Sequence, residues 1–228
     1  MLTFLRQFFR DARNTGSIMP SSPALARAMV AGLGTGGPQR WLEVGPGTGP
    51  FTRALLATKR PGDRLVIVEL SRDFCVRLEV DILEPWNAAH RAQAGEVALI
   101  NAPIEEARLE PGFDHVVCGL PFNNFPPKLM RRIFRRMFAL LKVGGELVYF
   151  EYAGVRVMKS PVVDGAGRAR LRRIDTIGKS LRRRHAGKRE LVLANFPPAY
   201  AYRLVNAGPD GAKRTRRAPA RGGATARR

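Results

Sequence analysis

Residues 42–52 read Leu-Glu-Val-Gly-Pro-Gly-Thr-Gly-Pro-Phe-Thr, and this stretch decides the fold class. An apolar segment of strand type runs into a Gly-x-Gly-x-Gly turn, and a helix is expected to follow. Glycines at 45, 47 and 49 allow a tight turn and let a ligand approach the backbone where a Cβ would clash. The turn delivers that ligand to a helix N-terminus. The alternative to a ligand site is an ordinary glycine-rich turn.

Two acidic residues accompany the glycine turn. Glu43 precedes the first glycine by two positions, whereas the dinucleotide fingerprint G-x-G-x-x-G needs no such acid. A carboxylate favours a nearby positive charge, and S-adenosylmethionine carries two, an ammonium and a sulfonium. Glu69 ends a β-branched run and lies twenty residues after Gly49. An acid at the tip of a second strand can accept hydrogen bonds from both ribose hydroxyls, although alone it would more often be a solvated loop residue.

Length and composition suit one α/β domain with appendages. The 228 residues are 45% hydrophobic, which is enough for a core, and no apolar run approaches the ~20 residues of a membrane span. No signal peptide is visible. The two cysteines, Cys75 and Cys118, fit a reducing cytoplasm and give no support to a zinc site. The net charge of +20 indicates a polyanionic partner, either nucleic acid or an anionic lipid surface.

Strand-like and helix-like segments alternate along the middle of the chain, which predicts a largely parallel sheet. Strands are expected at 40–44, 65–69, 97–100, 113–118 and 147–152, and helices at 23–30, 50–58, 72–83 and 128–141. Segments 191–196 and 200–205 are expected to form the reversed hairpin that closes this type of sheet. The arginine-rich stretch 164–189 has no clear assignment.

The two ends of the chain differ from its middle. Residues 1–15 are expected to hold an amphipathic helix with Leu and Phe on one side and arginines beside them. Such a helix either binds a membrane surface or packs its Phe face on the domain. Residues 16–206 are expected to form the main domain. Residues 207–228 are expected to be a disordered basic tail, because Gly, Pro, Ala, Thr and Arg dominate there without periodicity.

Ligands of open α/β sheets lie beyond the carboxyl ends of the strands. After the third strand, Asn101 either meets an adenine amino group or simply ends the strand. After the fourth strand, the apolar segment 119–122 is Gly-Leu-Pro-Phe. A rigid loop of this kind suits methyl transfer, because that chemistry needs alignment more than acid–base groups. No residue stands out as a general base; the candidates are Tyr149, Glu151, Tyr152 and His115.

Several of these stretches resemble known families. Residues 43–49 with Glu69 look like motif I and the ribose acid of class I S-adenosylmethionine-dependent methyltransferases. Segments 16–29, 119–122 and 195–203 resemble stretches of the bacterial phospholipid N-methyltransferases. The resemblance implies an α/β, Rossmann-like class I fold with a mostly parallel seven-stranded sheet and helices on both faces. It also implies stepwise methylation of phosphatidylethanolamine toward phosphatidylcholine, with attachment to membranes through an N-terminal amphipathic helix.

A second family shares the same motifs. The rRNA adenine dimethyltransferases carry Asn-Leu-Pro-Tyr after the fourth strand, and here Gly119 stands in place of that Asn, which weakens an RNA function. They also carry a C-terminal helical domain, where this chain offers a basic region and a tail. Asn101 stands where many members of the superfamily place Asp. A third possibility is a basic module without catalysis that binds membrane or nucleic acid; the intact glycine turn with both acids argues against it.

The sequence therefore predicts an S-adenosylmethionine-dependent N-methyltransferase acting on phospholipid amines, peripheral on the cytoplasmic face of the membrane. The residues expected around the cofactor are Glu43, Gly45, Pro46, Gly47, Thr48, Gly49, Glu69, Leu70, Asn101 and Ala102. The residues expected around the transferred methyl group are Gly119, Leu120, Pro121, Phe122 and Tyr152. An aromatic ring, Phe122 or Tyr152, could hold a methylated ammonium by a cation–π contact. Changing Gly119 to Asn is the substitution expected to separate lipid from adenine as substrate.

Overall fold

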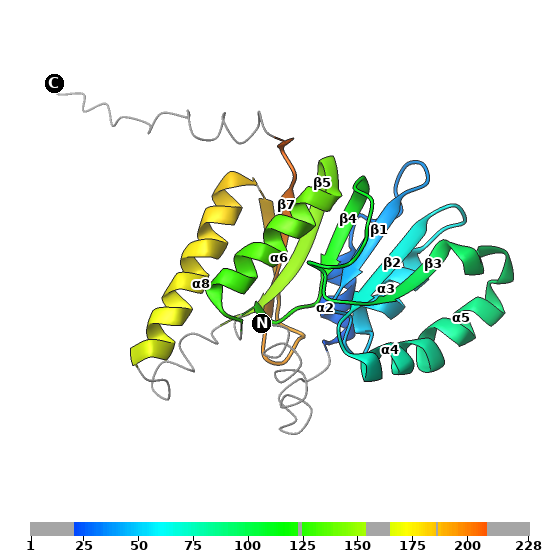
Figure 1. Cartoon of the computed structure of the whole chain (residues 1–228), viewed down its shortest axis with the longest axis horizontal. Coiled ribbons are helices and arrows are strands. Elements are labelled where there is room, and N and C mark those ends of the chain that lie inside the picture. The colour runs from blue at the N-terminus through cyan, green and yellow to red at the C-terminus, as the bar shows by residue number, and fades with distance from the viewer. Residues whose placement is uncertain (1–20, 123–124, 154–164, 186, 209–228) are drawn as a thin grey trace.

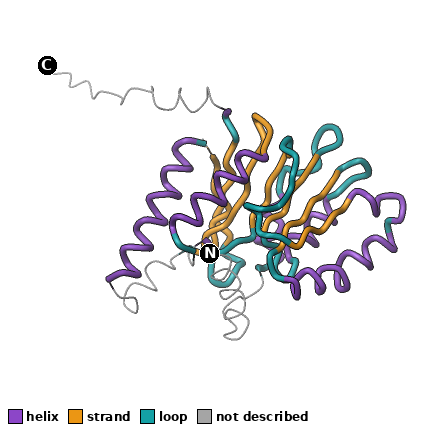
Figure 2. The backbone as a smooth tube through the Cα atoms, viewed as in Figure 1, coloured by secondary structure: helices purple, strands orange, loops and turns teal. Residues whose placement is uncertain are grey.

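A twisted sheet of seven strands organises the chain (Figures 1 and 2). The computed structural model describes residues 21–122, 125–153, 165–185 and 187–208. The strand order is β3-β2-β1-β4-β5-β7-β6, with β7 antiparallel to both of its neighbours and the other pairs parallel. The strands are β1 Arg40–Val44, β2 Arg64–Glu69, β3 Val97–Asn101, β4 Phe113–Cys118, β5 Leu141–Tyr152, β6 Gly187–Val192 and β7 Ala199–Val205.

Helices cover both faces of the sheet, which confirms the expected Rossmann-like architecture. Their bounds are α2 Pro23–Val30, α3 Pro50–Thr58, α4 Arg72–Leu78, α5 Glu84–Ala89, α6 Pro127–Leu140 and α8 Gly165–Arg184. Successive residues of a strand face opposite sides, so Trp41 packs in the core with α2 and α3, while Leu42 packs in the core with α6 and α8. No described helix combines the length and apolar composition needed to cross a bilayer.

The sequence misplaced the closing hairpin. The expected strand at 191–196 is instead Gly187–Val192, and residues 193–198 form the loop that joins β6 to β7. Residues 187–191 of β6 are exposed, because this strand lies at the edge of the sheet. An edge strand tolerates charged side chains such as Lys188, Arg189 and Glu190, so it lacks the apolar run that marks a buried strand.

The helical region after β2 is longer than expected. It was predicted to end before Pro85, but helix continues through a π-helical segment, Glu79–Leu83, into α5. Pro85 is the second residue of α5 and is accommodated there without ending the helical stretch. A 3-10 segment, Arg91–Glu96, then leads into β3.

Two further elements were missed or shortened. Most of the unassigned arginine-rich stretch 164–189 forms the twenty-residue helix α8, and its last residues, 187–189, begin β6. The fifth strand begins at Leu141 rather than 147, because Leu141 pairs with Phe113 before the register shifts and His115 pairs with Glu146. The expected N-terminal helix and the basic tail lie outside the described residues, apart from residues 207–208.

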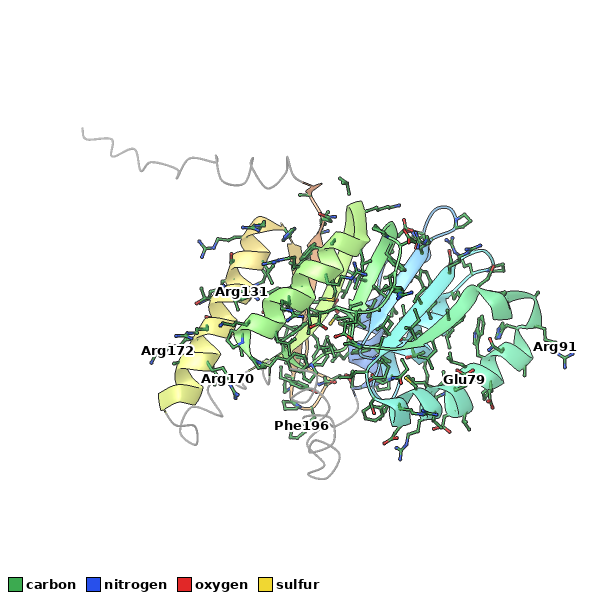
Figure 3. The ribbon with its side chains drawn as sticks, viewed as in Figure 1. Glu79, Arg91, Arg131, Arg170, Arg172 and Phe196 are labelled. Carbon is green, nitrogen blue, oxygen red and sulfur yellow. The ribbon has the colours of Figure 1, made fainter. Side chains whose placement is uncertain are left out.

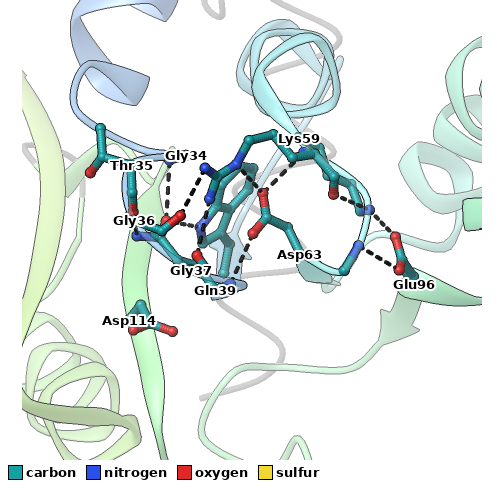
Figure 4. Close-up of polar contacts among 12 residues, drawn as sticks. Gly34, Thr35, Gly36, Gly37, Gln39, Lys59, Asp63, Glu96 and Asp114 are labelled. Atoms are coloured by element: carbon teal, nitrogen blue, oxygen red, sulfur yellow. Dashed lines mark hydrogen bonds and ion pairs between the residues drawn. The ribbon is translucent and has the colours of Figure 1, made fainter.

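A polar network fastens the edge of the sheet where the parallel strands begin (Figure 4). Asp63 accepts hydrogen bonds from the backbone N–H groups of Gln39 and Arg60. Lys59 forms an ion pair with Glu96, which in turn accepts from the N–H of Gly62. This network ties the loops before β1 and β2 together at the edge opposite to the ligand-binding ends.

Candidate active site

A cleft opens at the carboxyl ends of β1, β2 and β3, where the sequence placed a ligand. It encloses about 330 Å³ of empty space, part of it open to solvent. The residues that line it are Val44, Gly45, Val68, Glu69, Leu70, Ala102, Pro103, Ile104, Glu105, Leu120, Phe125 and Ile133. Five of the expected site residues are among them: Gly45, Glu69, Leu70, Ala102 and Leu120.

Glu69 is one of the two acidic residues of the cleft wall, with Glu105. One of its oxygens accepts a hydrogen bond from the N–H of Gly47 at 3.2 Å, and the other accepts from the N–H of Ser71 at 2.7 Å. The side chain is 1% exposed. These backbone donors fix the carboxylate between the glycine turn and the start of α4. A carboxylate held in this way can accept further hydrogen bonds from a pair of vicinal hydroxyls.

Glu43 lies at the end of β1 and faces the side of the sheet that α2 and α3 cover. It is fully buried, and its Oε2 accepts a hydrogen bond from the hydroxyl of Thr52 at 2.8 Å. No described residue donates to its Oε1. Burial, reinforced by the charge of Glu69, raises the pKa of Glu43 from 4.5 to about 8. A buried acid with an oxygen left over is suited to a cation that approaches the glycine turn.

The glycine turn itself leaves space at its centre. Gly47 has φ +58°, and a Cβ built there would meet no atom within 4 Å. Its neighbours serve the turn: the carbonyl of Pro46 accepts from the N–H of Gly49, and Thr48 is exposed. The open space beside Gly47 is therefore room for a ligand rather than for the protein.

The segment after β4 packs tightly against this turn. The N–H of Gly119 donates to the carbonyl of Val44 at 2.9 Å, which continues the β1–β4 pairing past the strand ends. A Cβ at Gly119 would lie 2.5 Å from the carbonyl oxygen of Gly45. The side chain of Leu120 covers Gly45 from the other side. Position 119 has no room for a side chain, so the substitution Gly119→Asn would disrupt packing whatever the substrate.

Phe122 points away from the cleft. Its ring is 1% exposed and packs against Phe134 at 4.6 Å and Tyr149 at 6.2 Å between ring centroids. Tyr152 ends β5 and packs edge-on against Phe150 on the opposite face of the sheet. Neither ring lines the cleft. The structure therefore does not place either of these aromatic side chains where the sequence predicted one, beside the transferred methyl group.

Asn101 is engaged with the backbone of the neighbouring strand. Its Nδ2 donates to the carbonyl of Glu69 at 2.9 Å and to that of Leu70 at 3.0 Å. The N–H of Ala102 also donates to the carbonyl of Glu69. Asn101 therefore joins the ends of β2 and β3, while Ala102 reaches the cleft wall.

The candidate bases divide between two places. His115 lies in the first half of β4, opposite Trp41, and burial lowers its pKa. Tyr149 and Glu151 lie near the end of β5, where both interact with Arg182 of α8, at 3.3 and 3.5 Å. Burial raises the pKa of Tyr149 well above its ordinary value. Among the described residues, no three His, Cys, Asp or Glu side chains are grouped to hold a metal ion.

Sequence reasoning missed much of the cleft wall. Pro103 and Glu105 come shortly after Asn101 and were not predicted, although their place after β3 was an available signal. Ile133 comes from the inner face of α6, and no sequence motif marks it. Since Ile104, Leu120, Phe125 and Ile133 are apolar, one side of the cleft suits a flat or aliphatic group.

Comparison with known proteins agrees with this geometry. A family model described as a methyltransferase domain matches residues 42–145. The ornithine lipid N-methyltransferase of Singulisphaera acidiphila is 30% identical over 142 residues, which are 62% of this chain and 72% of that protein. The ribosomal RNA small subunit methyltransferase A of Acaryochloris marina is 32% identical over 114 residues, which are 50% of this chain but 40% of that protein.

The solved structures show the same fold. The O-methyltransferase from Bacillus cereus, determined in complex with SAH, superposes with a TM-score of 0.57 at 16% identity and covers 90% of both chains. At this identity the likeness concerns the fold alone. The lipid N-methyltransferase relative, most of whose length this chain matches, and the matching domain model together show the family. The chain belongs to the class I S-adenosylmethionine-dependent methyltransferases and is an enzyme of that class.

Proposed function

We propose that this enzyme transfers methyl groups from S-adenosylmethionine to the amine of a phospholipid at a membrane surface, taking phosphatidylethanolamine toward phosphatidylcholine. The observation that carries the proposal is the segment after β4. It presents apolar Leu120 and Phe125 to the cleft, and its Gly119 has no room for a side-chain amide that could hold an adenine amine. A lipid amine needs no such amide, and apolar walls suit the start of its acyl chains.

The cofactor roles follow from the contacts of the two acids. Glu69 receives the ribose hydroxyls, because its carboxylate is already fixed at the cleft wall by two backbone donors. Glu43 provides a hydrogen-bond acceptor for the cofactor's ammonium, since its Oε1 has no described donor. The carboxyl is neutral below about pH 8 in the ligand-free protein, and a cation bound beside it would favour its ionised form. Leu70, Ala102 and Ile104 form the apolar side on which the adenine rests. These residues fit S-adenosylmethionine, which supplies an activated methyl group when bound.

What the protein contributes to the reaction is alignment. The backbone of 119–121 is held by the Gly119 hydrogen bond and by packing of Leu120 on Gly45, so it forms a rigid boundary beside the glycine turn. A rigid boundary fixes the line along which an amine approaches a methyl group, and this pre-orientation is worth several kcal/mol in well-aligned reactions. Phe122 acts behind this boundary by filling the core under the loop.

Methylation of an adenine in RNA is the second candidate. The rRNA enzyme relative and the net charge of +20 favour it, because arginines bind phosphates. Two observations favour the lipid over it: the chain matches 72% of the lipid enzyme but 40% of the rRNA enzyme, and position 119 is closed to a side chain.

The deciding experiment gives the full chain labelled S-adenosylmethionine and three acceptors in parallel: phosphatidylethanolamine vesicles, ornithine lipid vesicles and rRNA. Label in phosphatidylethanolamine supports the proposal, and label in ornithine lipid alone changes the substrate within the lipid class. Label in rRNA with unlabelled lipids refutes it, and the absence of label from all three acceptors refutes it as well. The variant Glu69→Ala should lose lipid labelling, whereas Glu190→Ala, which removes an exposed carboxylate from β6, should keep it.

A further inference from the structure

We propose that the β6–β7 loop, residues 193–198, inserts into an anionic phospholipid bilayer and that the basic first half of α8 contacts the lipid headgroups beside it. The inference rests on the proposed lipid function and adds to it the surface by which the folded domain meets the membrane. It is separate from the predicted helix at 1–15, which lies outside the described residues.

The β6–β7 loop holds the two most exposed large apolar side chains of the described residues. Phe196 is 76% exposed and Leu193 is 72% exposed. The loop is nevertheless braced from within, because Asn195 is 4% exposed and its Nδ2 donates to the carbonyl of Pro197 at 2.7 Å. The same side chain accepts from the N–H of Ser22 at 2.8 Å. A braced loop thus presents two large apolar side chains to water, and their transfer into an apolar medium would be favourable.

The topology places this loop at the ligand-binding edge. β5 and β6 both run antiparallel to β7, so β6 is parallel to β5 and ends at the same edge as the parallel strands. Figure 1 shows the loop at the end of the molecule toward which β1, β2, β4 and β5 point. The cleft also opens at this edge. A bilayer that receives Phe196 would therefore lie against the side of the protein where methyl transfer takes place.

Basic side chains lie at the same end of the molecule as the loop. Arg170, Arg172 and Arg173 of α8 are exposed, and Figure 3 shows the first two at the same end of the molecule as Phe196. The acid that follows them, Asp175, is 2.9 Å from the ammonium of Lys179. Arginines near an anionic lipid surface add electrostatic attraction to the insertion of apolar groups.

The combination of exposed apolar side chains in the loop with arginines on α8 favours a bilayer over RNA as the partner. Arginines alone would serve phosphates of either partner, and Phe196 could stack on a base. Leu193, however, is similarly exposed and has no π-face, so stacking on a base does not account for its exposure. Ser22, bonded to Asn195, is also next to the point where the segment 1–20 joins the domain. A membrane-binding N-terminal segment would then be anchored beside the same loop.

A fluorescent reporter tests insertion directly. Phe196→Trp in the full chain should show a blue-shifted emission with vesicles of phosphatidylglycerol and phosphatidylcholine, and quenching when the acyl chains are brominated. Val143→Trp is the matched control, because Val143 is 69% exposed at the opposite edge, near the start of β5. Equal responses at both positions, or none at 196, would overturn the inference. So would a response of the 196 reporter to rRNA but not to vesicles.

A second pair of variants measures the contribution of the loop to affinity. Leu193→Ser with Phe196→Ser should weaken vesicle binding by about ten-fold or more, since two large apolar side chains no longer leave water. Binding of S-adenosylhomocysteine should stay unchanged, and Val143→Ser should change neither quantity. Unchanged vesicle binding in the double variant would overturn the inference.

These vesicles contain no lipid with a primary amine, so docking is measured without catalysis. If wild-type protein methylates lipid but the reporter at 196 does not respond, the docking surface is wrong and the proposed function stands. If the reporter inserts and no lipid is methylated, the docking surface stands and the proposed function is wrong.

Discussion

Replacing Glu43 by Gln should remove a pH dependence from the stability of the ligand-free protein. Glu43 is fully buried, with Thr52 donating to one oxygen and no described donor for the other. Burial is the main cause that raises its pKa from 4.5 to about 8, and the negative charge of Glu69 adds to it. Gln has the same shape, still accepts the Thr52 hydrogen bond through its amide oxygen, and does not titrate.

The size and the sign of the effect follow from proton linkage. Below pH 4.5 the carboxyl is protonated in both the folded and the unfolded chain, so its contribution does not change. Between pH 4.5 and 8 the unfolded chain has lost a proton that the folded protein keeps, so the stability of the wild type falls as the pH rises. At about 1.4 kcal/mol per pH unit, the loss over this window is about 5 kcal/mol.

The assay is chemical denaturation at pH 5, 6, 7 and 8 of the wild type and two variants. The difference in the free energy of unfolding, Glu43→Gln minus wild type, should increase steadily with pH. By pH 8 this increase should approach about 5 kcal/mol. Glu190→Gln, which changes an exposed carboxylate, should run parallel to the wild type. Parallel curves for Glu43→Gln as well would refute the reasoning, because they would mean that Glu43 is ionised in the folded protein.

Three other perturbations test the site and the termini. Gly119→Ala should destabilise the fold by about 1–3 kcal/mol, because its Cβ would meet the Gly45 carbonyl at 2.5 Å; an unchanged melting temperature would contradict this close packing. Glu69→Ala should weaken binding of S-adenosylhomocysteine by ~1–3 kcal/mol in calorimetry, through loss of the hydroxyl contacts, and equal affinity would remove Glu69 from the cofactor site. Deletion of residues 1–13 should reduce sedimentation with anionic vesicles and leave cofactor affinity intact; full sedimentation of the truncated chain would assign membrane attachment to the folded domain alone.

The strands that could be predicted are those whose local pattern and burial agree. β1 and β4 occupy the expected residues, and β2 and β3 differ by one residue at one end, because a buried parallel strand is a short apolar run bounded by turn residues. The glycine turn after β1 was equally readable. Its positive φ angles at 45, 47 and 49 are conformations that glycine adopts readily.

The helix α8 was missed because arginines hide its apolar stripe. Leu171, Ile174 and Ile177 are buried and Leu181 is partly buried, and they recur every three or four residues against α6 and the sheet. The pattern is helical, but a composition so rich in arginine resembles a solvated or disordered segment. A count of apolar spacing, rather than of charge, would have found the helix.

The candidate site was only partly predictable, because a motif fixes which strand end a residue occupies but not what its side chain packs against. Glu43 was expected at the cofactor, and the structure holds it beneath the glycine turn through Thr52. Phe122 was expected at the methyl group, and Phe134 and Tyr149 draw its ring into the core instead. The place of the Phe122 ring depends on Tyr149, which is distant in sequence, so no local pattern could have foreseen it.

The topology links the two proposals made for this enzyme. Parallel strands gather their carboxyl ends at one edge, which is why the cleft forms there. The reversed strand β7 brings the β6–β7 loop to the same edge through a connection of six residues, 193–198. An enzyme that takes its substrate from a bilayer needs its reacting group and its membrane-contacting group to face the same way, since a lipid amine rises only a short distance above the acyl chains. A sheet closed by this hairpin meets that requirement within one domain, with Phe196 and the cleft facing the same surface.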